Sequence, residues 1–300
     1  MVERLSFEDE ISRNKLKSFL LIVVVFAFFV ALGYVISYAV DPSYFFIIMI
    51  ISIIFSLSYI LISYYNSDKI ALASVRAIPA SRTEHRMLFN AVENMSLASG
   101  LPMPKIYVMQ SLEINAFASG RSPQHAVICV TTGALEKLNK QELEGVIAHE
   151  MSHIANFDIR FMTLTAVLVG MVSIIAQIFL RNLWLSGNRS RNEKGNAIFM
   201  VIAIVFAILA PIAAQLVQLA ISRRREFTAD ATGVKFTRYP PGLTNALQKI
   251  KHEHLPEEEK KRYSPAVAPL FISDPFKKKV QGLFSTHPSI DARISLLRRM

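Results

Sequence analysis

The chain has little charge and almost no cysteine, and each scarcity excludes a class of protein. Only 19% of the 300 residues are charged and 52% are hydrophobic, whereas soluble proteins carry about 25% charged residues. This composition excludes a disordered chain, a collagen and a coiled-coil array. The single cysteine excludes a disulfide framework and every zinc site built on several thiolates. Any metal site must therefore use histidine and carboxylate ligands.

The charge that is present is mostly positive. Lys and Arg outnumber Asp and Glu by 33 to 23, which gives a formal net charge of +10. In a soluble protein this excess would suggest nucleic-acid binding. In a chain this apolar, basic residues beside lipid headgroups are the better explanation. We therefore expect a lipid bilayer as a partner, and no nucleic acid.

Four uncharged runs are long enough to cross a bilayer, which takes about 20 apolar residues per helix. They are residues 18–40, 44–65, 161–180 and 197–221. A three-residue turn separates the first two runs, so these form a hairpin. The first run is too long for the apolar core of a cleaved signal peptide, which spans about 7–15 residues.

The distribution of Lys and Arg predicts the orientation of these spans. With both termini and the large polar regions in the cytoplasm, twenty-nine of the thirty-three basic residues lie on that side. The other four lie between the third and fourth runs, on the opposite side, against the rule. They leave open whether those two runs cross the bilayer fully or form a re-entrant or surface hairpin.

The polar regions alternate short apolar runs with helical spacing. Runs bounded by Gly, Ser and Pro predict strands at residues 105–109, 114–118 and 125–131. Apolar residues at helical spacing predict helices at residues 88–99, from 136 onward, at 243–250 and from 288 onward. The expected fold class is an α+β membrane protein, with four transmembrane helices and a mainly helical cytoplasmic domain that contains a small β-sheet.

One motif carries chemistry, and it is His149-Glu150-Met151-Ser152-His153. Residues four apart lie on one face of a helix, so His149 and His153 can chelate one zinc ion. The carboxylate of Glu150 can reach a water molecule on the open position of the metal and act as a general base. This is the H-E-x-x-H arrangement of metalloproteases.

A zinc ion with a catalytic water needs a third protein ligand. No histidine follows soon after His153, so the candidates are carboxylates and the distant histidines. Glu226 and Asp230 are four residues apart and can face one site, with Glu226 as the ligand and Asp230 as the hydrogen-bond acceptor of His149. Asp158 is the nearest competitor. On a continuous helix it would lie about 140° around the axis from His153, so it is not expected to share the metal.

The chain resembles the HtpX family of membrane zinc endopeptidases, which are relatives of the CAAX prenyl endopeptidases within the gluzincins. The resemblance covers nearly the whole chain and rests on four motifs: His149 to His153, Ser222-Arg-Arg-Arg-Glu-Phe-Thr-Ala-Asp230, Asn115-Ala-Phe-Ala-Ser-Gly120 and Thr286-His-Pro-Ser-Ile-Asp-Ala-Arg293. It implies that one zinc ion per chain is bound by His149, His153 and Glu226, with Glu150 as the base.

The same resemblance implies the remaining roles. An edge strand would bind an extended substrate through main-chain hydrogen bonds, and its residues would be Asn115, Ala116, Phe117 and Ala118. His287, or alternatively Arg293, would stabilise the oxyanion. The expected function is zinc-dependent hydrolysis of peptide bonds in misfolded or damaged membrane proteins at the cytoplasmic face, a quality-control role.

These assignments divide the chain into four parts. They are an N-terminal transmembrane hairpin at 1–66, the first half of a catalytic domain at 67–160, a second transmembrane hairpin at 161–221 and the second half of the catalytic domain at 222–300. Two other functions stay open. One is a prenyl-protein (CAAX-type) peptidase, which would usually have more spans. The other is a non-catalytic zinc-binding membrane scaffold, in which Glu150 would have no use.

Overall fold

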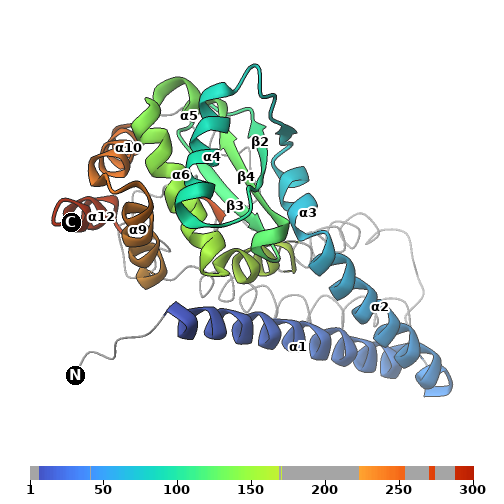
Figure 1. Cartoon of the computed structure of the whole chain (residues 1–300). Coiled ribbons are helices and arrows are strands. Elements are labelled where there is room, and N and C mark those ends of the chain that lie inside the picture. The colour runs from blue at the N-terminus through green and yellow to red at the C-terminus, as the bar shows by residue number, and fades with distance from the viewer. Residues whose placement is uncertain (1–6, 41, 169, 171–222, 254–269, 274–287) are drawn as a thin grey trace, which may run out of the picture.

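A computed structural model describes residues 7–40, 42–168, 170, 223–253, 270–273 and 288–300. In Figure 1 two long helices, α1 and α2, lie beside a domain in which helices cover a small sheet. In chain order the elements are α1 (Phe7–Val40), η1 (Pro42–Tyr44), α2 (Phe45–Tyr65), α3 (Ser67–Ser74), β1 (Ile78–Pro79), α4 (Arg86–Ser99), β2 (Lys105–Met109), β3 (Ala116–Gly120), η2 (Pro123–His125), β4 (Ala126–Thr131), α5 (Thr132–Lys137), α6 (Lys140–Ala155), α9 (Arg223–Thr237), α10 (Pro240–His252) and α12 (Ile290–Leu297).

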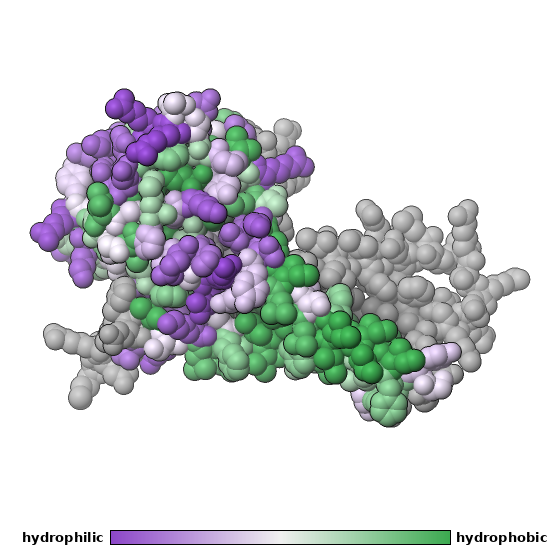
Figure 2. Space-filling model, turned by 45° about the vertical axis from the view of Figure 1, so that its right-hand side comes forward, coloured by the Kyte–Doolittle hydropathy of each residue, from purple (hydrophilic) through white to green (hydrophobic). Residues whose placement is uncertain are grey.

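The first two apolar runs form the expected helical hairpin. Among the described residues, α1 and α2 each contain a segment long and apolar enough to cross a membrane, and only 22% and 17% of their most apolar windows are buried. Figure 2 shows this exposed apolar surface as a continuous green band along the hairpin. Apolar side chains exposed over such a length need a lipid environment rather than water.

The third apolar run begins against this hairpin. Residues 158–168 are helical, and Phe161, Leu164 and Leu168 pack on α1 and α2 in one apolar cluster. The hydroxyl of Tyr59 on α2 donates a hydrogen bond to the backbone oxygen of Leu168, at 2.8 Å. The rest of the third run, the basic loop and the fourth run lie outside the described residues, so four spans stay an expectation.

The sheet is mixed and has the strand order β1-β2-β4-β3. Strands β2 and β4 are parallel, whereas β1 and β3 pair antiparallel with their neighbours. Every residue of β4 is buried, because helices cover both faces. Ile128 and Val130 face the core formed with α4 and α6, while Val127 and Cys129 face α3 and the start of the third apolar run.

The three expected strands are present, although the second begins two residues later than expected, at Ala116. The additional strand β1 has only two residues, which is too short for an alternating pattern. Helix α6 is buried on nearly all sides between the sheet, α4, α9 and α10. Gly145 permits this, since a Cβ atom there would lie 2.5 Å from the backbone nitrogen of Leu243 on α10.

Candidate metal centre

Helix α6 holds two imidazoles on one buried face. Its N-terminus is fixed by a capping box, in which the side chains of Asn139 and Glu142 each accept a hydrogen bond from the other's backbone N–H. One turn separates His149 from His153, and both are buried. Their Nε2 atoms lie 3.2 Å apart. The helix thus directs two nitrogen atoms at a single point.

Helix α9 brings a carboxylate to the same point. Glu226 lies 3.6 Å from Nε2 of His149 through Oε2 and 3.7 Å from Nε2 of His153 through Oε1. The ligand atoms of these three residues all lie within 4.8 Å of one another. Gly233 lets α9 approach α6 closely, because a Cβ atom there would lie 3.1 Å from the backbone nitrogen of His149.

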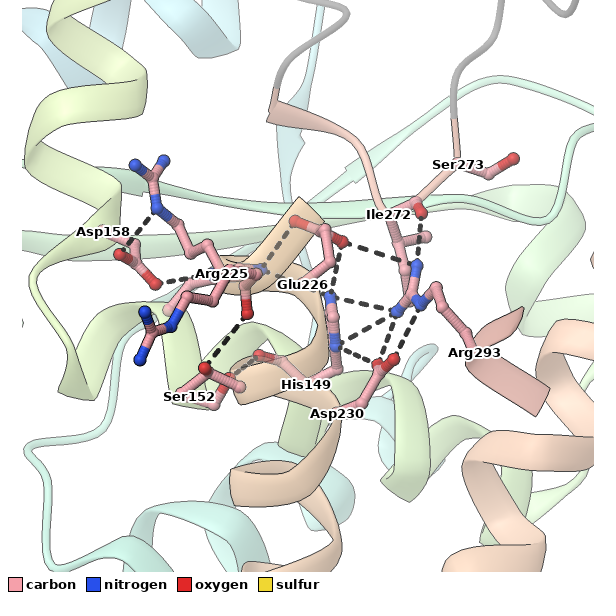
Figure 3. Close-up of polar contacts among 12 residues, drawn as sticks. His149, Ser152, Asp158, Arg225, Glu226, Asp230, Ile272, Ser273 and Arg293 are labelled. Carbon is pink, nitrogen blue, oxygen red and sulfur yellow. Dashed lines mark hydrogen bonds and ion pairs between the residues drawn. The ribbon is translucent and has the colours of Figure 1, made fainter. Parts of the chain in front are cut away.

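The outer nitrogen of each imidazole faces its own carboxylate. Nδ1 of His149 lies 2.9 Å from Oδ1 of Asp230, and Nδ1 of His153 lies 3.0 Å from Oδ2 of Asp158. Figure 3 shows Asp230 and Asp158 on opposite sides of the cluster. Each carboxylate favours a proton on Nδ1, so in the neutral form of either ring the lone pair lies on Nε2.

This arrangement fits a zinc ion. In the neutral rings the two Nε2 lone pairs face each other across 3.2 Å, an arrangement that a proton or a metal ion between them stabilises. Nitrogen atoms bound tetrahedrally to zinc at about 2.0–2.1 Å are about 3.3 Å apart. Two imidazoles and one carboxylate, with a fourth position left for water, are a ligand set of catalytic zinc.

The electrostatics of the cluster also favour a cation. Burial and the Arg293 guanidinium lower the pKa of His149, but hydrogen bonds to the carboxylates of Asp230 and Glu226 outweigh them and raise that pKa to about 9. Burial alone would raise the pKa of Asp230, yet the charges of Arg293 and His149 hold it below its usual value. Positive charge is therefore stabilised where the three ligand atoms meet.

Glu150 lies beside the point where the three ligand atoms meet. It is 1% exposed, and neither of its carboxylate oxygens has a hydrogen-bond partner among the described residues. Burial raises the pKa of this carboxyl, although the charges of His149 and His153 and the nearby backbone of Ala118 lower it. A buried carboxylate without a partner is expected to receive one from a water molecule or a substrate.

Arg293 lies behind the ligands and is fully buried among carboxylates. Its Nε and Nη2 atoms donate to the two oxygens of Asp230 at 2.8 and 2.6 Å, and Nη1 lies 3.4 Å from Oε2 of Glu226. Nη1 also donates to the backbone oxygen of Ile272 at 3.1 Å. Figure 3 shows this guanidinium between Asp230 and Ile272. Its N–H groups are thus engaged by the protein itself.

The expected substrate-binding strand is partly covered by the chain's own backbone. Phe271 forms an antiparallel bridge with Phe117, and the N–H of Ile272 donates to the oxygen of Ala116 at 3.0 Å. The side-chain amide of Asn115 donates to the oxygen of Ser273 at 2.9 Å. Three of the four expected substrate-binding residues therefore pair with residues 270–273, and Ala118 is the one beside Glu150.

The expectation for Asp158 is wrong in one respect. It assumed a continuous helix, but α6 ends at Ala155 and Phe157 has a φ of +57°, so the chain turns back on itself. Asp158 therefore comes to lie beside His153, as its hydrogen-bond partner rather than its competitor. The left-handed residue is Phe157 and not its neighbour Asn156, whose φ is −82°, so the residue type usual at such a turn does not mark it.

The structure brings together most of the residues expected at the site. His149, Glu150, His153, Glu226, Asp230 and Arg293 lie in one buried cluster. His287 lies outside the described residues, so its position stays an expectation.

The family model of peptidase family M48 matches residues 82–300. The chain belongs to peptidase family M48, and it is a membrane protease.

The relatives define the group within that family. The protease HtpX homologue of Thermoanaerobacter pseudethanolicus is 42% identical over 293 residues, which cover 96% of either chain. The homologue of Tropheryma whipplei strain Twist is 41% identical over 292 residues and 97% of either chain. These matches confirm the resemblance to the HtpX family. The crystal structure of S. mikatae Ste24p is similar with a TM-score of 0.45 and 18% identity, over 95% of this chain and 65% of that one.

Replacing Arg293 with methionine is expected to destabilise the metal-free protein by about 3–5 kcal/mol, because the carboxylates of Asp230 and Glu226 would stay buried without their guanidinium. Thermal unfolding of the detergent-solubilised chain measures this effect. Arg298→Met, at the exposed residue just past the end of α12, is the control and should leave the unfolding temperature nearly unchanged. If Arg293→Met unfolds at the wild-type temperature but loses peptidase activity, Arg293 contacts substrate instead.

Proposed function

We propose that the chain is a zinc-dependent endopeptidase in which His149, His153 and Glu226 hold one zinc ion. The observation that carries this proposal is the pair of Nε2 atoms 3.2 Å apart, each with its outer nitrogen on a carboxylate. A structural role for the metal would leave Glu150 buried without purpose. The unpartnered base therefore favours a catalytic site over a scaffold.

The chemistry follows from the donor set and the base. When bound, zinc acts as a Lewis acid that activates water and polarises a peptide carbonyl. Glu150 accepts the proton of the attacking water and passes it to the leaving amine. Asp230 and Asp158 hold the imidazoles of His149 and His153 in the tautomer that presents Nε2.

We assign oxyanion stabilisation to His287 rather than to Arg293. All three nitrogen atoms of the Arg293 guanidinium contact protein oxygens, so a role in holding Asp230 fits it better. An extended substrate would pair with the end of β3 at Ala118, next to Glu150. To reach Ala116 as well, the substrate would have to replace the pairing of Ile272.

We further propose that the substrates are misfolded or damaged membrane proteins, cleaved at the cytoplasmic face. Two observations support this. The catalytic cluster lies in a domain that packs directly on the apolar hairpin through residues 158–168. Main-chain pairing at a strand edge demands little of the substrate sequence, which suits a protease that degrades damaged chains.

Glu150→Gln is expected to keep zinc bound and to reduce casein cleavage by about 10²–10⁴-fold or more, because only proton transfer is lost. Metal analysis and cleavage assays on the same purified samples separate the two effects. Glu144→Gln on the partly exposed side of α6 is the matched control and should stay fully active. Cleavage by Glu150→Gln within a few-fold of wild type would exclude the role as base.

Glu226→Ala is expected to remove zinc or to weaken its binding severely, whereas Asp230→Ala should weaken it by about 10–100-fold, the usual effect of losing a carboxylate behind a ligand histidine. Chelator competition on the purified chain measures both affinities. Glu253→Ala, which removes a carboxylate bound to Lys137 away from the cluster, should bind zinc as the wild type does. One tightly held zinc per chain in Glu226→Ala would reject this ligand set.

The orientation can be tested with single cysteines in whole cells. Cys129 is fully buried and should not react, so an impermeant thiol reagent reports only the introduced cysteine. Leu97→Cys, which is exposed on α4, should be protected inside the cell, and Gly187→Cys should be labelled from outside. Protection of both positions would mean that the third and fourth apolar runs do not cross the bilayer.

A further inference from the structure

One polar side chain of the first apolar helix is buried against the metal centre. Asn14 on α1 is 5% exposed. Its amide nitrogen donates to Oδ1 of Asp158 at 2.7 Å and to the backbone oxygen of Asn156 at 3.2 Å. The amide group thus donates both of its hydrogen bonds to one short turn of the catalytic domain, which is distant from Asn14 in the sequence. Membrane anchoring alone does not require such a contact.

The carboxylate that Asn14 contacts is the one that orients a ligand histidine. Oδ2 of Asp158 accepts from Nδ1 of His153 at 3.0 Å. Its other oxygen, Oδ1, is held by Asn14 and by Nε of Arg225 at 3.1 Å. Figure 3 shows the Arg225 side chain reaching Asp158 beside the cluster. The plane of this carboxylate, and with it the ring of His153, is therefore fixed from α1 and α9 together.

The same helix also holds the backbone of that turn. Phe157 adopts a φ of +57°, which is unfavourable for a bulky residue and needs support from its surroundings. Lys15, the neighbour of Asn14, places Nζ 4.8 Å from the centre of the Phe157 ring. Two consecutive residues of α1 thus contact all three residues from 156 to 158, between the end of α6 and the third apolar run.

We propose that Asn14 is a positioning residue of the metal centre, which acts on His153 through Asp158. Packing of α1 against the catalytic domain then helps to form the zinc site, and does not only anchor the domain to the membrane. This inference rests on the proposed function, because it takes His153 as a zinc ligand. The opposing explanation is that Asn14 fastens α1 to the domain and has no effect on the metal.

Zinc affinity of the full-length chain in detergent, measured by chelator competition, distinguishes the two explanations. Asn14→Leu keeps a similar volume and a good helix former, but removes both N–H donors. It should weaken zinc binding by about 3–30-fold, less than the about 10–100-fold expected for Asp158→Ala. Ser18→Ala, one turn along α1 with its hydroxyl bonded to the backbone of Asn14, is the control and should bind zinc as the wild type does.

A double-mutant cycle tests the path of the effect. If Asn14 acts through Asp158, Asn14→Leu combined with Asp158→Ala should bind zinc no more weakly than Asp158→Ala alone. Cobalt in place of zinc gives a second readout, since its visible absorption reports the ligand geometry. The spectrum should change in Asn14→Leu and stay unchanged in Ser18→Ala. Asn14→Asp, which keeps the side-chain size and adds a repelling carboxylate, should weaken zinc at least as much and replaces the leucine variant if that one does not fold.

The outcomes separate this inference from the function on which it rests. Wild-type zinc affinity and an unchanged cobalt spectrum in Asn14→Leu would overturn the inference and leave the proposed function intact. The inference is also wrong if the leucine substitution weakens zinc equally in the native and the Asp158→Ala backgrounds. A wild-type chain that holds no zinc would overturn both.

Discussion

The facing imidazole nitrogens of α6 are the constraint on which the rest of the centre depends. Two rings can turn their Nε2 lone pairs toward each other only if each outer nitrogen has an acceptor for its proton, and the structure supplies Asp230 and Asp158. A buried carboxylate must in turn be paired. Arg293 pairs with Asp230, while Arg225 and Asn14 hold Asp158. The orientation of these two imidazoles thus depends on side chains from α1, α9 and α12.

Regular spacing explains which parts of the site could be predicted from the sequence. His149 and His153 are four residues apart on one helix, as are Glu226 and Asp230, so their common faces follow from helical geometry. The strands were predictable because their apolar runs end at Gly, Ser and Pro. Asp158 was not, because its place depends on where α6 ends and on a positive φ that no periodicity contains.

Contacts between distant segments could not be derived from local patterns. Asn14 looks like the polar flank of an apolar run until the fold brings it to the turn after α6. The segment at Phe271 and Ile272 is too short to show alternation, yet it pairs with β3 and occupies backbone groups that an extended substrate would use. The edge available to a substrate is therefore set by the tertiary structure as well as by the motif at residues 115–118.

The ligand helices α6 and α9 are separated in the chain by residues 156–222, which include the second pair of apolar runs. During synthesis, the two histidines therefore emerge from the ribosome long before the carboxylate that would complete their ligand set. The first half of the catalytic domain is then present, but it lacks Glu226 and the helices α9 and α10 that pack on α6. A nascent chain is thus without a complete metal site until the second pair of apolar runs has been made.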